Sequence, residues 1–115
     1  MKALNFYSST YHGILVLRRK HCTIRVGDKS SKYREGDLVW VTYGDRFHKR
    51  RKVFTAVIDR LEVKKLSELT PEDLEGEDPE MKTVDEAARL LSRVYGRPVG
   101  PDELVSVVYF SEVSE

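Results

Sequence analysis

The chain has 115 residues, of which 40% are hydrophobic and 34% charged, and its 20 basic and 19 acidic residues give a formal net charge of +1. This length suits one core, so we expect residues 1–115 to form a single domain. No apolar run approaches the roughly 20 residues of a membrane span, and residues 1–7 lack the apolar core of a signal peptide. The single cysteine, Cys22, excludes an internal disulfide and a cysteine-rich zinc site, which favours a reducing, cytoplasmic setting.

Charged residues are distributed unevenly along the chain. Residues 18–25 hold four Lys or Arg side chains and no acid, and residues 46–52 read Arg-Phe-His-Lys-Arg-Arg-Lys. Residues 68–86, by contrast, are strongly acidic, with Lys82 as their one base. Such segregation can leave a basic face on a protein whose total charge is near zero. The alternative is a solvated loop and a solvated helix surface, and the total charge by itself predicts no partner.

The first half of the chain carries mainly strand signals. Residues 8–17 are ambiguous, because hydroxyl caps and a rough apolar face indicate a helix that Gly13 weakens. A short β-branched run predicts a strand over Thr23–Val26. β-branched and aromatic residues predict two longer strands over Leu38–Tyr43 and Val53–Val63. The loop that joins these two strands indicates an antiparallel hairpin.

The second half contains two helix starts. Thr70 is a helix N-cap, and Pro71 occupies the first helical position, where its missing N–H costs nothing. The main helix starts at Thr83, with Glu86 three residues later as its capping-box partner. Gly96 is the expected end of this helix, since glycine readily adopts the left-handed conformation of a C-cap.

A last strand and the order of the elements define the expected fold. Residues 104–113 alternate, with one face carrying Val105, Val107, Tyr109 and Val113 and the other carrying Ser106, Val108 and Phe110. A few strands with helices before the last one suit an α+β fold. We expect a small mixed β-barrel of about five or six strands packed by two or three helices. Such a barrel leaves a cleft where strand ends meet helices.

Polar side chains are concentrated where the first predicted strand begins, in Lys20-His21-Cys22-Thr23-Ile24-Arg25. Alternate side chains of a strand share a face, so Thr23 and Arg25 point the same way, and Lys20 has the reach to join them. A lysine, a hydroxyl and a guanidinium together suit a phosphate, a carboxylate or a nucleobase carbonyl. The alternative is a basic strand edge, where Lys and Arg prevent wrong pairing.

Lys-x-x-Thr-x-Arg followed by Gly-Asp-Leu-Val-Trp-Val resembles the ASCH domain (activating-signal-cointegrator homology) of the PUA-like superfamily. The stretches 54–58 and 66–70 and a closing Val-Val-Tyr-Phe-Ser fit the same layout, so the resemblance runs from about Ile14 to Val113. Two positions depart from the general pattern. Arg18 stands where ASCH domains have a glycine, and Thr23 stands where they often have a glutamate. The second departure is shared with a closer branch, the small bacterial acetylcytidine amidohydrolases.

This resemblance implies a PUA-like barrel and, in the closer branch, a catalytic set of Lys20, Thr23 and Glu77, with Glu75 and Glu80 as alternatives to Glu77. Amide hydrolysis needs a nucleophile, a group that moves protons and a group that holds the oxyanion. Thr23 would be the nucleophile or orient one, Lys20 would activate it if burial lowers its pKa, and Glu77 would shuttle the proton.

The leading hypothesis from the sequence is an ASCH-type module that binds RNA or a modified nucleoside, as a monomer or weak homodimer. Its binding residues are predicted to be Arg25, Arg19, Lys49, Arg50 and Arg51, with Tyr33, Tyr43 or Phe47 stacking on a base. The first alternative is an amidohydrolase that deacylates an acetylcytidine-like nucleoside, or a ribonuclease. The second is a protein-interaction module without chemistry, which would use the acidic residues 68–86.

Other reactive or aromatic side chains receive structural roles. The scattered His12, His21 and His48 have no ligand spacing, so we expect no metal and no cofactor. Strand alternation turns Cys22 away from Thr23, which favours a buried apolar cysteine over a reactive one. Trp40 lies among valines, which favours a core position over a platform for a base.

Overall fold

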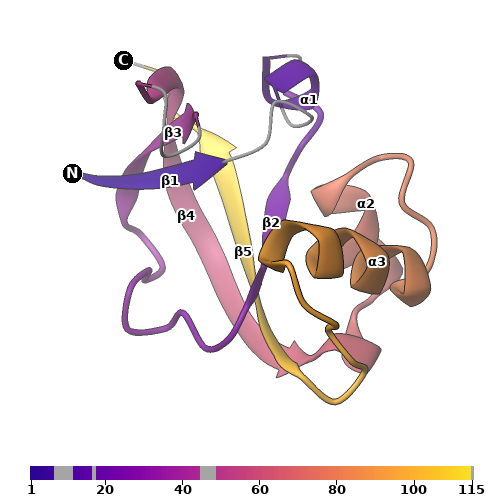
Figure 1. Cartoon of the computed structure of the whole chain (residues 1–115). Coiled ribbons are helices and arrows are strands. Elements are labelled where there is room, and N and C mark those ends of the chain that lie inside the picture. Colours follow the sequence, from indigo (N-terminus) through magenta and orange to yellow (C-terminus); the bar gives the residue numbers. More distant parts are fainter. Residues whose placement is uncertain (7–11, 17, 45–48, 115) are drawn as a thin grey trace.

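The computed structural model describes residues 1–6, 12–16, 18–44 and 49–114, whose elements follow one another as β and α segments (Figure 1). In chain order these are β1 (Lys2–Phe6), α1 (His12–Val16), β2 (Cys22–Val26), β3 (Leu38–Tyr43), β4 (Arg51–Lys65), the 3-10 helix η2 (Leu66–Glu68), α2 (Pro71–Glu77), α3 (Val84–Tyr95) and β5 (Leu104–Glu112). The described residues thus confirm the predicted α+β class, with five strands and three α-helices.

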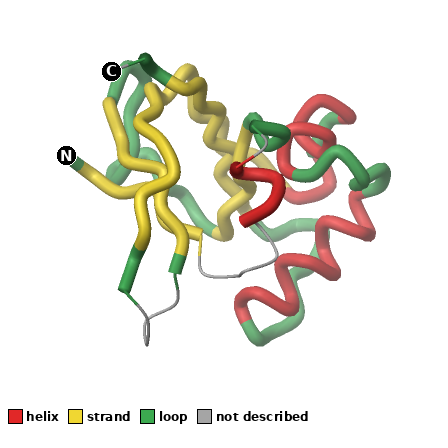
Figure 2. The backbone as a smooth tube through the Cα atoms, turned by 90° about the horizontal axis from the view of Figure 1, so that it is seen from above, coloured by secondary structure: helices red, strands yellow, loops and turns green. Residues whose placement is uncertain are grey.

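The strands form one curled sheet in the order β1-β3-β4-β5-β2. β1 runs parallel to β3, whereas β3 with β4, β4 with β5 and β5 with β2 are antiparallel pairs. The predicted hairpin of β3 and β4 is therefore confirmed. Seen from above, the strands curl as a half-barrel, with most of the helical residues to one side (Figure 2).

The long strand β4 makes the sheet curl. Its 15 residues would span about 50 Å if fully extended, which exceeds the 38 Å longest dimension of the molecule. The register with β5 shifts between Ile58 and Arg60, and such bulges bend a strand and increase its twist. β4 can therefore pair with β3 along its first half and with β5 along its second.

Two cores pack on opposite faces of the sheet. The barrel core lies between the strands and includes Leu4, Phe6, Leu15, Tyr33, Val39, Val41, Phe54, Ala56, Ile58, Val108 and Phe110. The helix-side core lies under α2 and α3 and includes Cys22, Ile24, Val26, Leu66, Leu69, Leu74, Met81, Ala87, Leu91, Val99, Val105, Val107 and Tyr109. The two predicted faces of β5 are confirmed, because Val107 and Tyr109 enter one core and Val108 and Phe110 the other.

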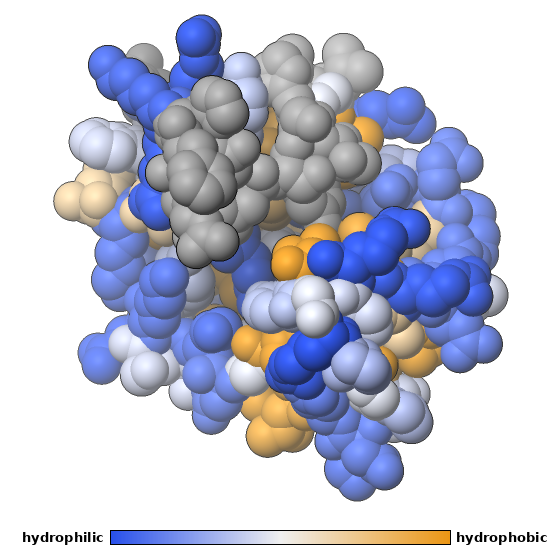
Figure 3. All heavy atoms as spheres, viewed as in Figure 1, coloured by the Kyte–Doolittle hydropathy of each residue, from blue (hydrophilic) through white to orange (hydrophobic). Residues whose placement is uncertain are grey.

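The face seen in Figure 3 is mainly hydrophilic, with apolar side chains in small patches.

Local sequence signals begin α2 and α3 and end α3 as predicted, except that the Glu86 carboxylate accepts from the Thr83 hydroxyl at 3.2 Å and does not complete the predicted capping box. The Thr70 hydroxyl accepts a hydrogen bond from the Asp73 amide at 3.1 Å, and the Thr83 hydroxyl accepts one from the Glu86 amide at 3.1 Å. Gly96 has a left-handed φ of 69° and ends α3. Within the ambiguous residues 8–17, the described helix α1 is short, and residues 8–11 lie outside the described ranges.

Two features differ from the sequence-based expectations. β1 was not predicted, since its five residues carry a weak pattern and its partner β3 lies more than 30 residues away. Trp40 was expected in the core, but 44% of its surface is exposed. The reason is alternation on β3, where Val39 and Val41 point into the barrel core and Trp40 points outward.

Candidate functional site

The C-terminal end of α2 covers the edge of β2. The Gly76 carbonyl accepts a hydrogen bond from the His21 amide at 2.8 Å, and Glu77 Oε1 accepts one from the Ile24 amide at 3.3 Å. A Cβ atom on Gly76 would lie 2.7 Å from Cys22 Sγ, so only glycine allows this close approach. Glu77 is therefore held at the polar start of β2 by two contacts, one through the backbone of Gly76 and one through its own carboxylate.

Lys20 and Glu77 form a buried ion pair at this junction. Their exposed fractions are 3% and 1%, the Lys20 ammonium contacts Glu77 Oε2, and it also donates to the Glu77 carbonyl at 2.7 Å. Removal from water lowers the pKa of the Lys20 amine well below its usual value, and the nearby charge of Arg25 lowers this pKa further. A lysine of this kind has an enlarged neutral fraction, which is the form that accepts a proton.

Thr23 and Arg25 lie on the opposite face of β2 from Cys22, as predicted. Arg25 Nε donates to Thr23 Oγ1 at 3.0 Å, and Arg25 Nη2 donates to the Asn5 carbonyl of β1 at 3.0 Å. Arg25 thus bridges the two edge strands of the curled sheet. The Lys20 ammonium and the Arg25 guanidinium lie 5.3 and 5.0 Å from the centre of the Phe6 ring. These contacts bring the predicted Lys20, Thr23, Arg25 and Glu77 into one neighbourhood.

A cationic cleft of about 190 Å³ opens at the free edge of β1; its lining residues are Ala3, Asn5, Arg25, Lys29, Lys32, Tyr33, Arg50 and Tyr95. The lining holds four cationic side chains, two tyrosines and no carboxylate. The Tyr33 hydroxyl donates to the Ala3 carbonyl at 3.2 Å, and the Tyr95 hydroxyl accepts from the Val26 amide at 3.1 Å. The two tyrosines are thereby positioned by backbone groups, and the cations supply a site for an anion.

The structure divides the predicted binding residues into two groups. Arg25, Arg50 and Tyr33 line the cationic cleft. Arg19, Lys49 and Arg51 are exposed but are not among the residues that line it, and Tyr43 packs partly against the barrel core. Phe47 lies outside the described residues. Of the alternatives to Glu77, Glu75 is exposed and Glu80 lines a separate groove.

The sequence-based prediction lacked five lining residues of the cleft, which are Ala3, Asn5, Lys29, Lys32 and Tyr95. Lys29 and Lys32 follow β2 in a polar loop, and their positive charge is the signal that could have indicated an anion site. Tyr95 is the last residue of α3, and an aromatic residue at a helix end is too common to indicate a site. Asn5 had no signal, because the strand that carries it was not predicted.

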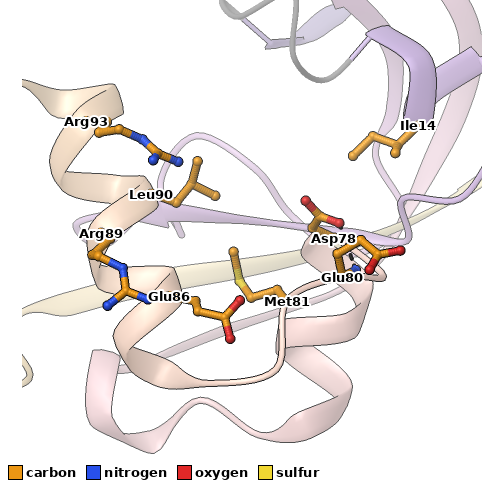
Figure 4. A pocket seen from close by; sticks show the side chains of 8 residues that line it. All are labelled: Ile14, Asp78, Glu80, Met81, Glu86, Arg89, Leu90 and Arg93. Carbon is orange, nitrogen blue, oxygen red and sulfur yellow. Dashed lines mark hydrogen bonds between the residues drawn. The ribbon is translucent and has the colours of Figure 1, made fainter.

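A second groove of about 270 Å³ separates α3 from α1 and the segment after α2 (Figure 4). Figure 4 shows Glu86, Arg89, Leu90 and Arg93 along α3, facing Met81 and Ile14 across the groove. Acids and arginines are mixed in its lining, with Asp78, Glu80 and Glu86 against the two arginines. This groove therefore lacks the uniform positive charge of the cationic cleft.

The described residues also bear on metal ligands, membrane spans and the single cysteine. No three His, Cys, Asp or Glu side chains gather as a metal site within the described residues. No helix in the described part of the chain is both long enough and apolar enough to cross a membrane. Cys22 is fully buried, as predicted, and its thiol donates to the Asp73 carbonyl at 3.2 Å.

Solved structures show which fold the chain shares. Neither models of known protein families nor curated protein sequences match the chain. The crystal structure of an ASCH domain from Lactobacillus crispatus JV V101 is similar over 96% of this chain and 78% of that one, with a TM-score of 0.68 and 19% identity. Protein EF3133 from Enterococcus faecalis V583, of the DUF984 family, is similar over 98% and 80%, with a TM-score of 0.69 and 15% identity.

The crystal structure of the hypothetical protein PH0355 is similar over 98% of this chain and 100% of that one, with a TM-score of 0.67 and 16% identity. The likenesses extend over nearly the whole chain, in agreement with the resemblance seen in the sequence motifs. The chain therefore shares the fold of these solved structures, one of which is an ASCH domain.

Proposed function

We propose that this protein binds RNA, with the phosphates of the strand in the cationic cleft. The observation that carries the proposal is the lining of that cleft, where Arg25, Lys29, Lys32 and Arg50 meet without a carboxylate. Arg and Lys are the side chains that proteins use to hold phosphate oxygens. An ASCH-like fold is consistent with this function, because RNA or nucleoside binding is what the resemblance implied.

The size of the cleft favours an RNA backbone over an isolated nucleoside. Pockets that enclose a whole small-molecule ligand usually have at least about 300 Å³, whereas this cleft has about 190 Å³. A phosphate with its sugar fits such a volume, and the rest of the strand then lies on the surface. The modified nucleoside of the sequence-based hypothesis would need a larger enclosed space than this cleft offers.

The test is binding of a short, fluorescein-labelled single-stranded RNA, followed by anisotropy at several salt concentrations. Four neutralised phosphates predict that log K falls with log salt with a slope of about −3, at roughly 0.7 per phosphate. The double variant Lys29→Ala/Lys32→Ala should bind more weakly and reduce the slope by about 1.4. Arg50→Ala should reduce it by about half that amount.

Lys82→Ala is the matched control, because Lys82 is an exposed lysine that donates to the Pro79 carbonyl and lies among acidic residues. Its affinity and salt slope should equal those of the unmodified protein. Binding that does not depend on salt, or that both cleft variants leave unchanged, would refute the proposal. Circular dichroism of each variant confirms that the fold is retained.

A second candidate function, deacylation of an acetylcytidine-like nucleoside, is favoured by the contact of Lys20 with Glu77. In this reaction Thr23 attacks the acetyl carbonyl, the Lys20 amine accepts the hydroxyl proton and returns it to the leaving amino group, and water then releases acetate. Glu77 keeps Lys20 in place and relays protons. The three side chains are at most 3% exposed, which is why binding in the open cleft is proposed first.

Incubation with acetylcytidine and chromatographic detection of cytidine tests this second function. The unmodified protein should release cytidine, and Thr23→Val, which keeps the side-chain shape without the hydroxyl, should abolish release. The Lys82→Ala control should retain the full rate. If no cytidine forms at enzyme concentrations comparable to the substrate, Lys20 and Glu77 have a structural role only.

A further inference from the structure

An exposed tryptophan lies on the outer face of the sheet. Trp40 and Leu38, two residues apart on β3, are 44% and 48% exposed. Tryptophan is usually largely covered in a folded protein, so an exposed indole beside an exposed leucine is an informative observation. Within the described residues neither core includes Trp40, because the core-facing residues of this strand are Val39 and Val41.

Trp40 is also the immediate neighbour of the cationic cleft. Its register partner on β1 is Ala3, which lines that cleft. Adjacent strands are about 4.8 Å apart, so the indole begins one strand spacing from the cleft wall. Alanine is too small to cover it. The indole therefore lies one strand away from a residue that lines the cleft.

Basic side chains follow the same surface onto β4. The Lys52 ammonium lies 5.9 Å from the centre of the Trp40 ring, within the range of a cation–π contact. Arg50, two residues earlier, lines the cationic cleft. An aromatic face flanked by cations is the combination with which proteins bind single-stranded nucleic acid, since each base has a π face and each nucleotide has a phosphate.

We propose that Trp40 is a stacking platform for a base of single-stranded RNA whose neighbouring phosphates lie in the cationic cleft. This inference rests on the proposed function and extends it, because it names an unpaired strand as the ligand. A base in a duplex is stacked on its neighbours and has no free face for the indole. The charge of the surrounding residues favours a polyanion over a second copy of this nearly neutral chain.

The only tryptophan of the chain makes the test direct. Oligouridine is added to the unmodified protein while the indole fluorescence is recorded, and affinity is measured in parallel by anisotropy. Stacking should quench the fluorescence at the same RNA concentrations that raise the anisotropy. Trp40→Ala should weaken binding by about 5- to 100-fold and leave the salt slope unchanged. Trp40→Phe should recover part of the affinity.

Leu38→Ala is the matched control, because it removes an equally exposed apolar side chain from the same face of β3. It should bind RNA as the unmodified protein does. Inorganic phosphate provides a second control, since it has no base to stack on the indole, and its binding should be the same for Trp40→Ala.

The outcomes separate this inference from the proposed function. If RNA binds with the predicted salt slope, but it does not quench the indole fluorescence of the unmodified protein and Trp40→Ala binds it equally tightly, the platform is refuted. The proposed binding in the cleft then stands. If no RNA binds, both proposals fail. If Trp40→Ala instead abolishes a dimer detected by sedimentation without affecting RNA, the face is an interface between copies and the platform is refuted.

Discussion

Removing one partner of the buried Lys20–Glu77 pair should destabilise the protein strongly. Lys20→Met leaves the Glu77 carboxylate without a countercharge at 1% exposure. Breaking a buried ion pair from one side costs about 3–5 kcal/mol, which is a large part of the roughly 5–15 kcal/mol that stabilises a domain. Glu77→Gln keeps a carbonyl oxygen for the Ile24 amide and should cost less, because the lowered pKa of Lys20 allows its amine to lose the proton.

The double variant Lys20→Met/Glu77→Gln contains neither charge. Its loss of stability should be smaller than the sum of the two single losses by about 2 kcal/mol, since each single variant already includes the loss of the pair. Urea unfolding at neutral pH measures all four proteins, and a loss of 3–5 kcal/mol corresponds to a midpoint shift of about 2 M.

Lys64 and Glu62 provide a matched control pair. Their ion pair has a distance of 2.8 Å, but the two side chains are 15% and 36% exposed. Lys64 also contacts the buried Asp73 at 2.8 Å, so Lys64→Met alone should be destabilising. Partly exposed pairs contribute about 0–1 kcal/mol, so the cycle Lys64→Met/Glu62→Gln should still show little coupling. If Lys20→Met costs less than about 1 kcal/mol and the first cycle is additive, the argument from burial is wrong.

Two predictions concern the contact of Gly76 with Cys22. Gly76→Ala should lower the free energy of unfolding measured in urea by about 1–3 kcal/mol, because the new methyl group would overlap Cys22 Sγ. The double variant Cys22→Ala/Gly76→Ala should lose less stability than the sum of the two single changes. Strict additivity would contradict the overlap. Burial raises the pKa of the Cys22 thiol to about 12. The unfolded thiol titrates near 8.5, so the contribution of this thiol to stability is constant below that pH and falls as the pH rises from about 9 towards 12. Cys22→Ala should remove this slope, which urea unfolding across the alkaline range measures.

The helix boundaries could be predicted because their causes are local. A threonine side chain reaches an amide three residues away, and a glycine adopts a left-handed conformation without help from distant residues. Thr70, Thr83 and Gly96 therefore carried reliable signals. The faces of β5 were equally predictable, since strand alternation is a property of the backbone.

Trp40 and β1 could not be predicted for the opposite reason. On β3, Leu38 and Trp40 alternate with Val39 and Val41, so both faces read as apolar. Only the curl of the sheet decides which of these two sides of β3 packs against the core. β1 is short and parallel to β3, and a parallel partner leaves no turn signal between the strands.

The candidate site divides in the same way. The sequence by itself predicted that Lys20, Thr23 and Arg25 lie near one another, because alternate side chains of a strand share a face and Lys20 has the reach to join them. Only the tertiary structure decided that Glu77 contacts Lys20, which lies 57 positions earlier in the chain. This contact depends on the close approach of α2 to β2 at Gly76, where a side chain would overlap Cys22. It also decided that Lys29, Lys32 and Arg50 meet Arg25 in one cleft. Long-range contacts of this kind come from packing of whole elements, which no local pattern encodes.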